Sequence, residues 1–276
     1  MRAALIQLNA SDDPAANLPV TRRFLAEAAK KGADLILTPE VSNCVSASRS
    51  RQSDVLETEE NDITLATLRE DAEHLGKWLL IGSLALKSDD PQGRFANRSF
   101  LIAPDGSVAA RYDKIHMFDV AISGDETYRE SAGYRPGTRA VLADTPFGRI
   151  GMTICYDLRF PALYRSLAQA GAQILTVPSA FSPITGAAHW QTLLRARAIE
   201  SGCFVLAPAQ CGTHSAAHGK PRKTHGHSLA VAPWGQVLAG GGVEPGITMV
   251  DFDLAEVEVA RSRIPSLTHD RAFKGP

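Results

Sequence analysis

The chain of 276 residues is 44% apolar and 21% charged, and its formal net charge at pH 7 is −1. This length suits one large α/β domain or two smaller ones. A charge balance so close to neutral predicts neither a nucleic-acid partner nor binding to an anionic membrane. The longest stretch without Asp, Glu, Lys or Arg, residues 166–194, is interrupted by glycines and prolines, so we expect core and loop there and no transmembrane span.

The N-terminus starts directly with a strand-like segment at 2–8 and shows no basic region followed by an apolar stretch and a cleavage site. Export is therefore not expected, and we predict a cytoplasmic protein. The four cysteines, Cys44, Cys155, Cys203 and Cys211, lack the C-x-x-C spacing of zinc sites and redox dithiols. We expect reduced thiols, no metal and no cofactor.

The two halves of the chain follow the same order of predicted elements. The first half has a strand at 2–9, a helix at 20–31, an apolar segment at 32–39, a helix at 63–75, a strand at 78–86 and a hairpin at 103–108. The second half has a strand at 149–155, a helix at 162–170, an apolar segment at 171–178, a helix at 190–201, a strand at 203–208 and a hairpin at 232–237.

Two short motifs recur in this order. Gly-Ala-x-aliphatic-aliphatic-x-x-Pro begins at 32 and again at 171, which is 139 positions later, and Ala-Pro-x-Gly-x-Val begins at 103 and again at 232, which is 129 positions later. The repetition predicts two similar α/β layers in a single domain. Segments 79–82 and 203–206 are apolar throughout, as expected of strands that are covered on both faces.

Four segments depart from the repeat and are predicted to be functional insertions: 42–62, 118–139, the turn region 182–189, and 211–227. The last is rich in Gly, His and Lys. That composition fits a mobile lid over a site, and it fits an ordinary surface loop equally well.

Cys155 is the candidate nucleophile, because a run of strand-forming residues ends at this thiol and a helix-like segment follows. A cysteine at such a turn is expected to expose its sulfur at the sheet edge, beside backbone N–H groups that favour the thiolate. The alternative is a buried, inert cysteine.

Glu40 and Lys114 are the candidate partners of Cys155. Glu40 follows Pro39 at the end of the second strand of the first half, and Lys114 follows the first hairpin. In the repeat register, both can meet Cys155 where strand ends converge, a common place for ligands in α/β sheets. Taken alone, the glutamate could equally be a charge at a helix N-terminus and the lysine a solvated side chain.

The spacing of these residues resembles the nitrilase superfamily of carbon–nitrogen hydrolases over nearly the whole chain. The motifs are Pro-Glu at 39–40, Tyr-x-Lys-x-His at 112–116 and Gly-x-x-x-Cys-Tyr-Asp-x-Arg-Phe-Pro at 151–161. The resemblance implies an α-β-β-α sandwich, in which two mixed sheets stack face to face with helices outside. It implies one domain over 1–276, with a C-terminal tail from about 255 packing at a subunit interface.

The resemblance also implies roles in hydrolysing a linear amide without a cofactor. Cys155 would attack the carbonyl carbon, while Glu40 would take the thiol proton, deliver it to departing ammonia and then activate water against the thioester. Lys114 and the backbone N–H of Tyr156 would stabilise the oxyanion. Glu130 would support the lysine, the alternative being a solvated loop carboxylate.

Further residues receive smaller roles. Tyr156, Phe181 and Thr185 are the expected substrate contacts. His116 could pair with the thiol, since Cys–His pairs are common, but a structural role is preferred because base and oxyanion partner are already supplied. The helix that opens at 189–190 is expected to pack on the sheet near a second subunit.

Smaller signals indicate a branch of the superfamily. Tyr-Asp directly after the nucleophile is typical of small amidases, and the stretches 178–190, 194–200 and 209–212 resemble deaminated glutathione amidases. Their substrate is a glutathione whose amino group has become a keto group. The alternatives are an ω-amidase acting on α-ketoglutaramate or another small aliphatic amide or nitrile, and a non-catalytic metabolite-binding homologue. The expected assembly is a homodimer or a larger even-numbered homo-oligomer.

Overall fold

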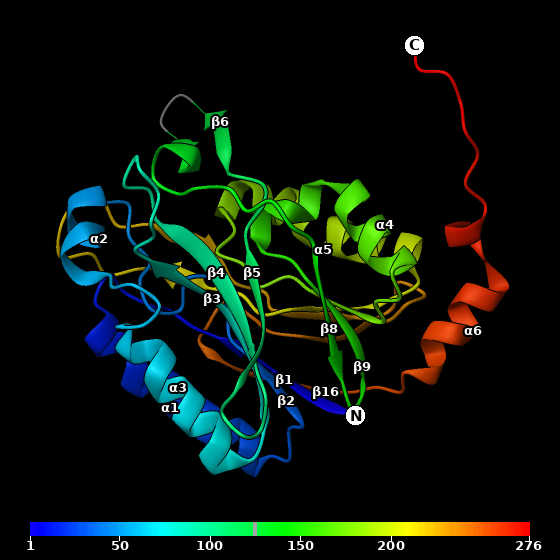
Figure 1. The fold of residues 1–276 in the computed structure, drawn as a ribbon, viewed down its shortest axis with the longest axis horizontal. Helices are drawn as coiled ribbons and strands as arrows, with labels where there is room; N and C mark the ends of the chain where they lie inside the picture. The colour runs from blue at the N-terminus through cyan, green and yellow to red at the C-terminus, as the bar shows by residue number, and fades with distance from the viewer. Residues whose placement is uncertain (124–125) are drawn as a thin grey trace.

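A computed structural model describes residues 1–123 and 126–276. Two six-stranded mixed sheets stack face to face, with α1 and α3 outside one and α4 and α5 outside the other (Figure 1). The first sheet has the order β16 (Gly246–Asp251), β1 (Arg2–Gln7), β2 (Leu35–Leu37), β3 (Trp78–Leu86), β4 (Ala96–Ile102), β5 (Val108–Asp113). The second has the order β15 (Val237–Gly240), β14 (Leu229–Val231), β11 (Phe204–Ala207), β10 (Ile174–Thr176), β9 (Gly148–Met152), β8 (Val141–Thr145). The predicted α-β-β-α sandwich is confirmed.

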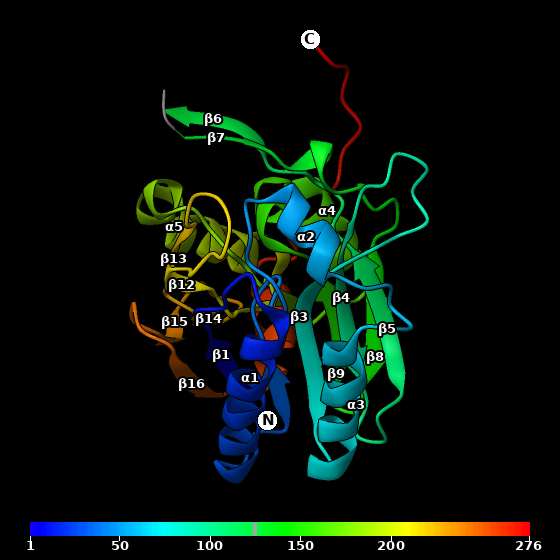
Figure 2. The ribbon, with the colours of Figure 1, turned by 90° about the vertical axis from the view of Figure 1, so that its left-hand side faces the viewer.

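Helices and two small hairpins complete the fold. The larger helices are α1 (Pro14–Lys30), α3 (Ile63–Leu75), α4 (Pro161–Gln169), α5 (Pro183–Ser201) and α6 (Ala255–Arg263). The shorter ones are α2 (Arg49–Val55), η1 (Glu130–Ala132), η2 (Cys155–Arg159) and η3 (Ser266–Thr268). Separate hairpins pair β6 (Asp119–Ser123) with β7 (Glu126–Arg129), and β12 (Cys211–Thr213) with β13 (Lys223–His225). Figure 2 shows α2 and the β6–β7 hairpin at the same end of the sandwich.

The inner strands β1, β2 and β3 of the first sheet are predominantly apolar on both faces because both faces are covered. In β1, Ala3 and Leu5 pack into the core between the two sheets, while Ala4 and Ile6 pack against α1 and α3. Successive strand side chains point to opposite faces, so a strand between two apolar layers needs no polar positions.

The internal repeat is confirmed in detail. In the two hairpins that carry the repeated Ala-Pro-x-Gly-x-Val motif, the same backbone bonds close the turn, from Ala103 to Ser107 at 2.9 Å and from Ala232 to Gln236 at 2.8 Å. Both hairpins also have an irregularity in strand register one step before the turn, at 101–102 and at 230–231. The motif therefore determines a turn and a β-bulge together.

Three element boundaries differ from the sequence prediction by three residues or more. Helix α1 begins at Pro14, because Asp13 caps it and a proline is favourable at the first helical position. Helix α5 also begins at a proline, Pro183, although its N-cap residue Ser182 makes no side-chain cap, so the predicted turn region 182–189 is mostly helical. Strand β9 ends at Met152, three residues before Cys155.

The C-terminal region starts by packing on its own chain. Val257 and Ala260 of α6 are buried, and Arg261 donates hydrogen bonds to the carbonyl oxygens of Ala172 and Ser201. Residues after Asp270 are exposed and extend away from the sandwich (Figure 1). In the part of the chain that the structure describes, no helix is both long and apolar enough to cross a membrane.

Candidate active site

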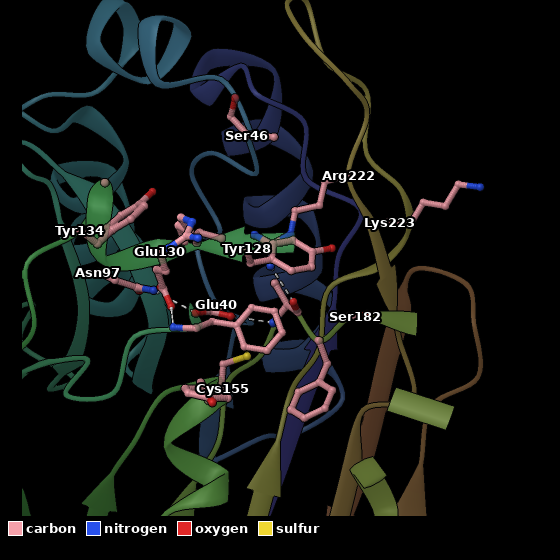
Figure 3. Close-up of a pocket in the computed structure, with 18 of the residues that line it drawn as sticks. Glu40, Ser46, Asn97, Tyr128, Glu130, Tyr134, Cys155, Ser182, Arg222 and Lys223 are labelled. Carbon is pink, nitrogen blue, oxygen red and sulfur yellow. Dashed lines mark hydrogen bonds between the residues drawn. The ribbon is translucent and has the colours of Figure 1, made fainter. Parts of the chain in front are cut away.

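Glu40, Lys114 and Cys155 line one cavity, at the end of the sandwich where β2 and β9 terminate. Their exposed fractions are 3%, 2% and 7%. Figure 3 shows Glu40 and Cys155 in this cavity. The ammonium Nζ of Lys114 lies 2.9 Å from Oε1 of Glu40 and 2.9 Å from both carboxylate oxygens of Glu130. The structure thus brings the three distant segments together and places Glu130 beside them.

Glu40 is held at both carboxylate oxygens. Its Oε1 accepts from Lys114 and from Nδ2 of Asn97, both at 2.9 Å, and its Oε2 accepts from the backbone N–H of Ala180 at 2.8 Å. Burial raises the pKa of Glu40, but the charges of Lys114 and then Arg222 outweigh burial, so its pKa lies below the ordinary value. Glu40 is therefore ionised at neutral pH and can accept a proton.

The backbone next to Glu40 is strained. Val41, a β-branched residue, adopts a φ of 47°, in the left-handed region that such residues avoid. Its N–H donates to the hydroxyl of Ser83 at 2.8 Å, which holds this conformation. Strain of this kind persists where surrounding contacts determine the backbone.

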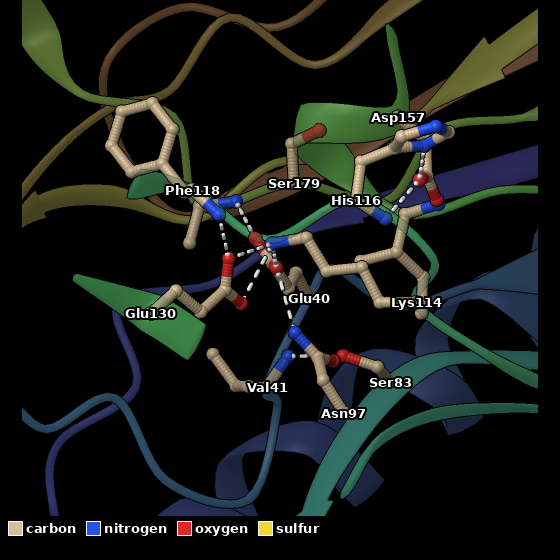
Figure 4. A network of polar contacts seen from close by, with 12 residues as sticks. Glu40, Val41, Ser83, Asn97, Lys114, His116, Phe118, Glu130, Asp157 and Ser179 are labelled. Atoms are coloured by element: carbon tan, nitrogen blue, oxygen red, sulfur yellow. Dashed lines mark hydrogen bonds and ion pairs between the residues drawn. The ribbon is translucent and has the colours of Figure 1, made fainter. Parts of the chain in front are cut away.

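Lys114 is a buried ammonium between two carboxylates (Figure 4). Burial alone would lower the pKa of Lys114, but the charges of Glu130 and Glu40 raise it well above the ordinary value. Lys114 is therefore protonated, which suits it to stabilise a developing negative charge and excludes it as a base.

Cys155 lies at a sharp turn into η2. Its φ of 47° is in the left-handed region, and its N–H donates to the carbonyl of Pro178 at 3.0 Å. Tyr156 follows in the first turn of η2, where N–H groups lack intrahelical acceptors. The turn therefore presents a thiol next to a backbone donor.

The expectation of a stabilised thiolate at Cys155 is corrected by the structure. Burial and the charge of Glu40 raise the pKa of the Cys155 thiol, and the opposing charge of Lys114 does not compensate. The resting group is therefore a thiol, and its sulfur can act as a nucleophile only if a base removes this proton.

His116 points away from this centre. Its Nδ1 lies 2.7 Å from Oδ1 of Asp157, its backbone N–H donates to the same oxygen at 3.0 Å, and its ring stacks on Phe160 at 3.5 Å between centroids. The buried Asp157 also accepts from Tyr112 at 2.6 Å and from the N–H of Ile154 at 2.9 Å. His116 and Asp157 thus join the Lys114 loop to the Cys155 turn.

The cavity has a volume of about 910 Å³, near the upper end of the range for small-molecule sites. Tyr156 and Phe181 line it as expected. Thr185 does not: it lies in the first turn of α5, and its buried hydroxyl has no hydrogen-bond partner in the described part of the chain. The predicted substrate contact of Thr185 is thus not seen.

Sequence reasoning missed several lining residues. They come largely from the four insertions, and they include Ser46, Gln52, Glu126, Tyr128, Tyr134, Ser182 and Arg222, together with Asn97 of β4. The one available signal was the insertions themselves. Their breaks in the repeat marked functional loops but did not show which side chains point inward.

Comparisons with known proteins agree with this site. Residues 2–262 match the carbon–nitrogen hydrolase family. A deaminated glutathione amidase of Yersinia enterocolitica is 39% identical, over 97% of this chain and 92% of that protein. The crystal structure of the Caenorhabditis elegans NitFhit protein has a TM-score of 0.89 at 35% identity over 98% of this chain, which spans 65% of that longer protein.

A third relative carries a chemical observation. An amidase variant from Nesterenkonia sp. AN1 has a TM-score of 0.77 at 28% identity, over 96% of this chain and 98% of that chain. In that structure acrylamide has added to the active-site cysteine. With the buried Glu40, Lys114 and Cys155 meeting in one cavity, these comparisons confirm the resemblance: the chain belongs to the carbon–nitrogen hydrolase family, and within it to the amidases.

Proposed function

We propose that this amidase hydrolyses the γ-amide of deaminated glutathione through a thioester on Cys155. The observation that carries the proposal is the buried array of Glu40, Lys114 and Glu130 beside a protonated thiol at the bottom of a large cavity. The name of the Yersinia relative supports the choice of substrate.

The geometry supports a balanced two-step reaction. The Cys155 sulfur forms a bond to the carbonyl carbon while Glu40 takes the thiol proton, and the oxyanion faces Lys114 and the N–H of Tyr156. The C–N bond then breaks as Glu40 returns the proton to the departing nitrogen. In the second step Glu40 takes a proton from water, the hydroxide displaces the sulfur, and the proton goes back to the thiolate.

Glu130 keeps the charge of the array balanced. When Glu40 has accepted the thiol proton, it no longer neutralises Lys114, but Glu130 still holds the ammonium with both oxygens. Lys114 therefore stays fixed and charged at the moment when the oxyanion forms.

The leaving group differs between the two candidate substrates. Deaminated glutathione and α-ketoglutaramate share the same acyl group, and the first loses cysteinylglycine while the second loses ammonia. Glutathione contains no primary amide, so the expected release of ammonia applies to α-ketoglutaramate only. The ω-amidase reaction remains the second candidate because both substrates would form the same acyl-enzyme.

Two measurements test the proposal. Wild type should form α-ketoglutarate from deaminated glutathione with a kcat/KM well above that on α-ketoglutaramate, and Cys155→Ala should form none from either. Equal signals from both proteins, or inactivity of wild type across a panel of amides and nitriles, would favour a non-catalytic metabolite-binding homologue.

Intact mass tests the intermediate. Wild type quenched in acid during turnover of either substrate should carry the same ketoglutaryl adduct on Cys155, because only the leaving groups differ, and Cys155→Ala should carry none. Failure to detect an adduct with any substrate would count against Cys155 as the nucleophile.

We also propose that the enzyme is cytoplasmic and works as a homodimer or larger even-numbered oligomer. Exposed apolar side chains support association: Ile199 of α5, Trp234 of the second hairpin, and Val259 and Ile264 at α6. Light scattering of wild type and of a Trp234→Ser, Ile264→Ser double variant tests this, since the double variant should shift to a smaller species. A monomeric wild type would contradict it.

A further inference from the structure

We propose that Arg222 binds the carboxylate of the leaving group, and so selects amides whose leaving amine is a short acidic peptide over amides that release ammonia. This inference rests on the proposed function and adds a specificity-determining residue to it. Arg222 lies in the segment 211–227, just before β13, is half-buried, and lines the same cavity as Cys155.

The first step concerns which oxygen of Glu40 carries the proton. A carboxylate oxygen has about two lone-pair directions. Oε1 already accepts two hydrogen bonds, from Lys114 and Asn97, whereas Oε2 accepts one, from the backbone N–H of Ala180. Oε2 is therefore the oxygen with room for the proton that passes from the thiol to the departing nitrogen.

The second step locates the leaving group. A group that delivers a proton must be within hydrogen-bond reach of the atom that receives it. The departing nitrogen thus lies near Oε2 of Glu40, on the side of Ala180 and away from Lys114. Whatever is bonded to that nitrogen extends from the same side.

The third step places Arg222 on the same side of Glu40 as Ala180. Its Nη2 donates to the carbonyl oxygen of Ala180 at 2.9 Å, so one residue links the guanidinium to Oε2 of Glu40. Figure 3 shows Arg222 extending into the cavity above Glu40, while the neighbouring Lys223 points away. An extended dipeptide spans roughly 7 Å, and Arg222 is close enough to Glu40 for its charge to lower the pKa of that carboxyl.

The fourth step is the charge of this position. No carboxylate of residues 1–123 or 126–276 lies within ion-pair distance of Arg222. Glu126, the nearby acidic residue of the cavity wall, instead accepts hydrogen bonds from the hydroxyls of Tyr128 and Ser182. Arginine has five N–H donors and recognises carboxylates with two parallel bonds, so Arg222 has donors to spare for an acidic ligand.

The experiment compares three substrates on four proteins. The substrates are deaminated glutathione, its analogue with the glycine carboxylate converted to an amide, and α-ketoglutaramate. The proteins are wild type, Arg222→Gln, Arg222→Lys, and Lys223→Gln as the matched control.

Arg222→Gln should lower kcat/KM for deaminated glutathione about 10- to 100-fold, the loss of one charged hydrogen-bonded contact, and should affect the other two substrates far less. Wild type should discriminate against the amidated analogue by a similar factor, and Arg222→Gln should not. Arg222→Lys should retain part of the preference, and Lys223→Gln should match wild type on all three.

The outcomes separate this inference from the proposed function. Parallel losses of Arg222→Gln on all three substrates would mean that Arg222 acts through Ala180 and Glu40, and would overturn the inference while the substrate assignment stands. A wild type that is active on α-ketoglutaramate and inactive on deaminated glutathione would overturn the substrate assignment and the inference with it.

Discussion

The two halves of the sandwich share their topology, their hairpins and their bulges, yet they differ at the positions where chemistry occurs. In the register of the repeated motifs, Ser179 of the second half stands where the first half has Glu40, and Val243 stands where it has Lys114. Lys114 is 2% exposed and Val243 is 55% exposed. The first half therefore supplies the charged pair Glu40 and Lys114. The corresponding positions of the second half carry Ser179 and the solvent-exposed Val243.

The proposed nucleophile, Cys155, comes from the other half. Pairing along β1 and β9 places Leu8 at the position that corresponds to Cys155, and Leu8 is an ordinary buried residue. Neither half alone holds a complete site. The comparison shows that the backbone fold shared by the two halves determines which positions lie close together. The residue types at those positions, which differ between the halves, determine the chemistry that the site can support.

The largest expected effect comes from substituting Glu40, and the matched control is a substitution of Ser179, its counterpart in the second half. Glu40→Gln should lower kcat/KM by up to about 10⁴-fold, because the group that moves protons in both steps is lost. Ser179→Ala should change it by no more than about threefold, since the Ser179 hydroxyl only donates to the carbonyl of Val177. Steady-state kinetics on α-ketoglutarate formation measures both, and comparable losses would contradict an asymmetric distribution of chemistry.

Removal of Lys114 should have the next largest effect. Lys114→Met should lower kcat/KM about 10²- to 10³-fold through loss of an oxyanion donor. The charge of Lys114 lowers the pKa of Glu40, so the variant should also lose activity at a higher pH on the acidic limb of its pH–rate profile. An unchanged acidic limb, with circular dichroism showing a folded protein, would argue against this coupling.

His214 provides a stability test of how segment 211–227 of the second half is attached to the first. Its ring lies 2.7 Å from the carbonyl of Ala10 and 2.7 Å from the hydroxyl of Thr224, and burial lowers its pKa to about 4. Below about pH 6.5 His214 is protonated in the unfolded chain but stays neutral in the folded protein. The free energy of unfolding therefore falls as the pH decreases from about 6.5 to about 4.

The expected loss of unfolding free energy over this window is on the order of 3 kcal/mol. Urea unfolding across the pH range should show a steeper dependence for wild type than for His214→Gln. Identical slopes would mean that His214 does not titrate on unfolding.

The smallest expected effects concern the repeated hairpins. Gly106 and Gly235 have φ values of 75° and 87°, which L residues adopt only with strain. Gly106→Ala should reduce stability by about 1–2 kcal/mol. Gly235→Ala should cost at least as much, because its Cβ would also lie 2.6 Å from the side chain of Ile199. Urea unfolding checks this. A cost at only one hairpin would show that the two copies no longer share the same turn.

The sequence was informative where a pattern repeats or a motif has fixed spacing. Strands β1, β2, β3, β9, β10 and β11 and the repeated hairpins were predicted from apolar runs and turn motifs, and Glu40, Lys114 and Cys155 were predicted from strand-end motifs. Strands β6, β7, β8, β12, β13 and β16 were not predicted. Arg222 and the backbone of Ala180 could not be predicted, because their positions depend on how insertions fold over the sheets. Asn97 is followed by Arg98 and Ser99 in β4, so its polarity alone did not distinguish it.

The predicted thiolate at Cys155 was wrong, and the reason is again that the outcome depends on tertiary packing. A turn into a helix lowers a thiol pKa when the turn is solvated, but here burial and a neighbouring carboxylate have the opposite effect. Both depend on tertiary packing, which the local sequence does not contain.

The protonation of the Cys155 thiol also affects how fast it reacts with oxidants and with electrophilic inhibitors. Peroxides and simple alkylating agents attack thiolates, and the pKa of Cys155 is raised by burial, as are those of Cys44, Cys203 and Cys211. A molecule with the shape of an amide brings its own carbonyl to Lys114 and lets Glu40 remove the proton. Selective covalent inhibitors should therefore imitate the substrate, and we expect the Cys155 sulfur to react slowly with oxidants.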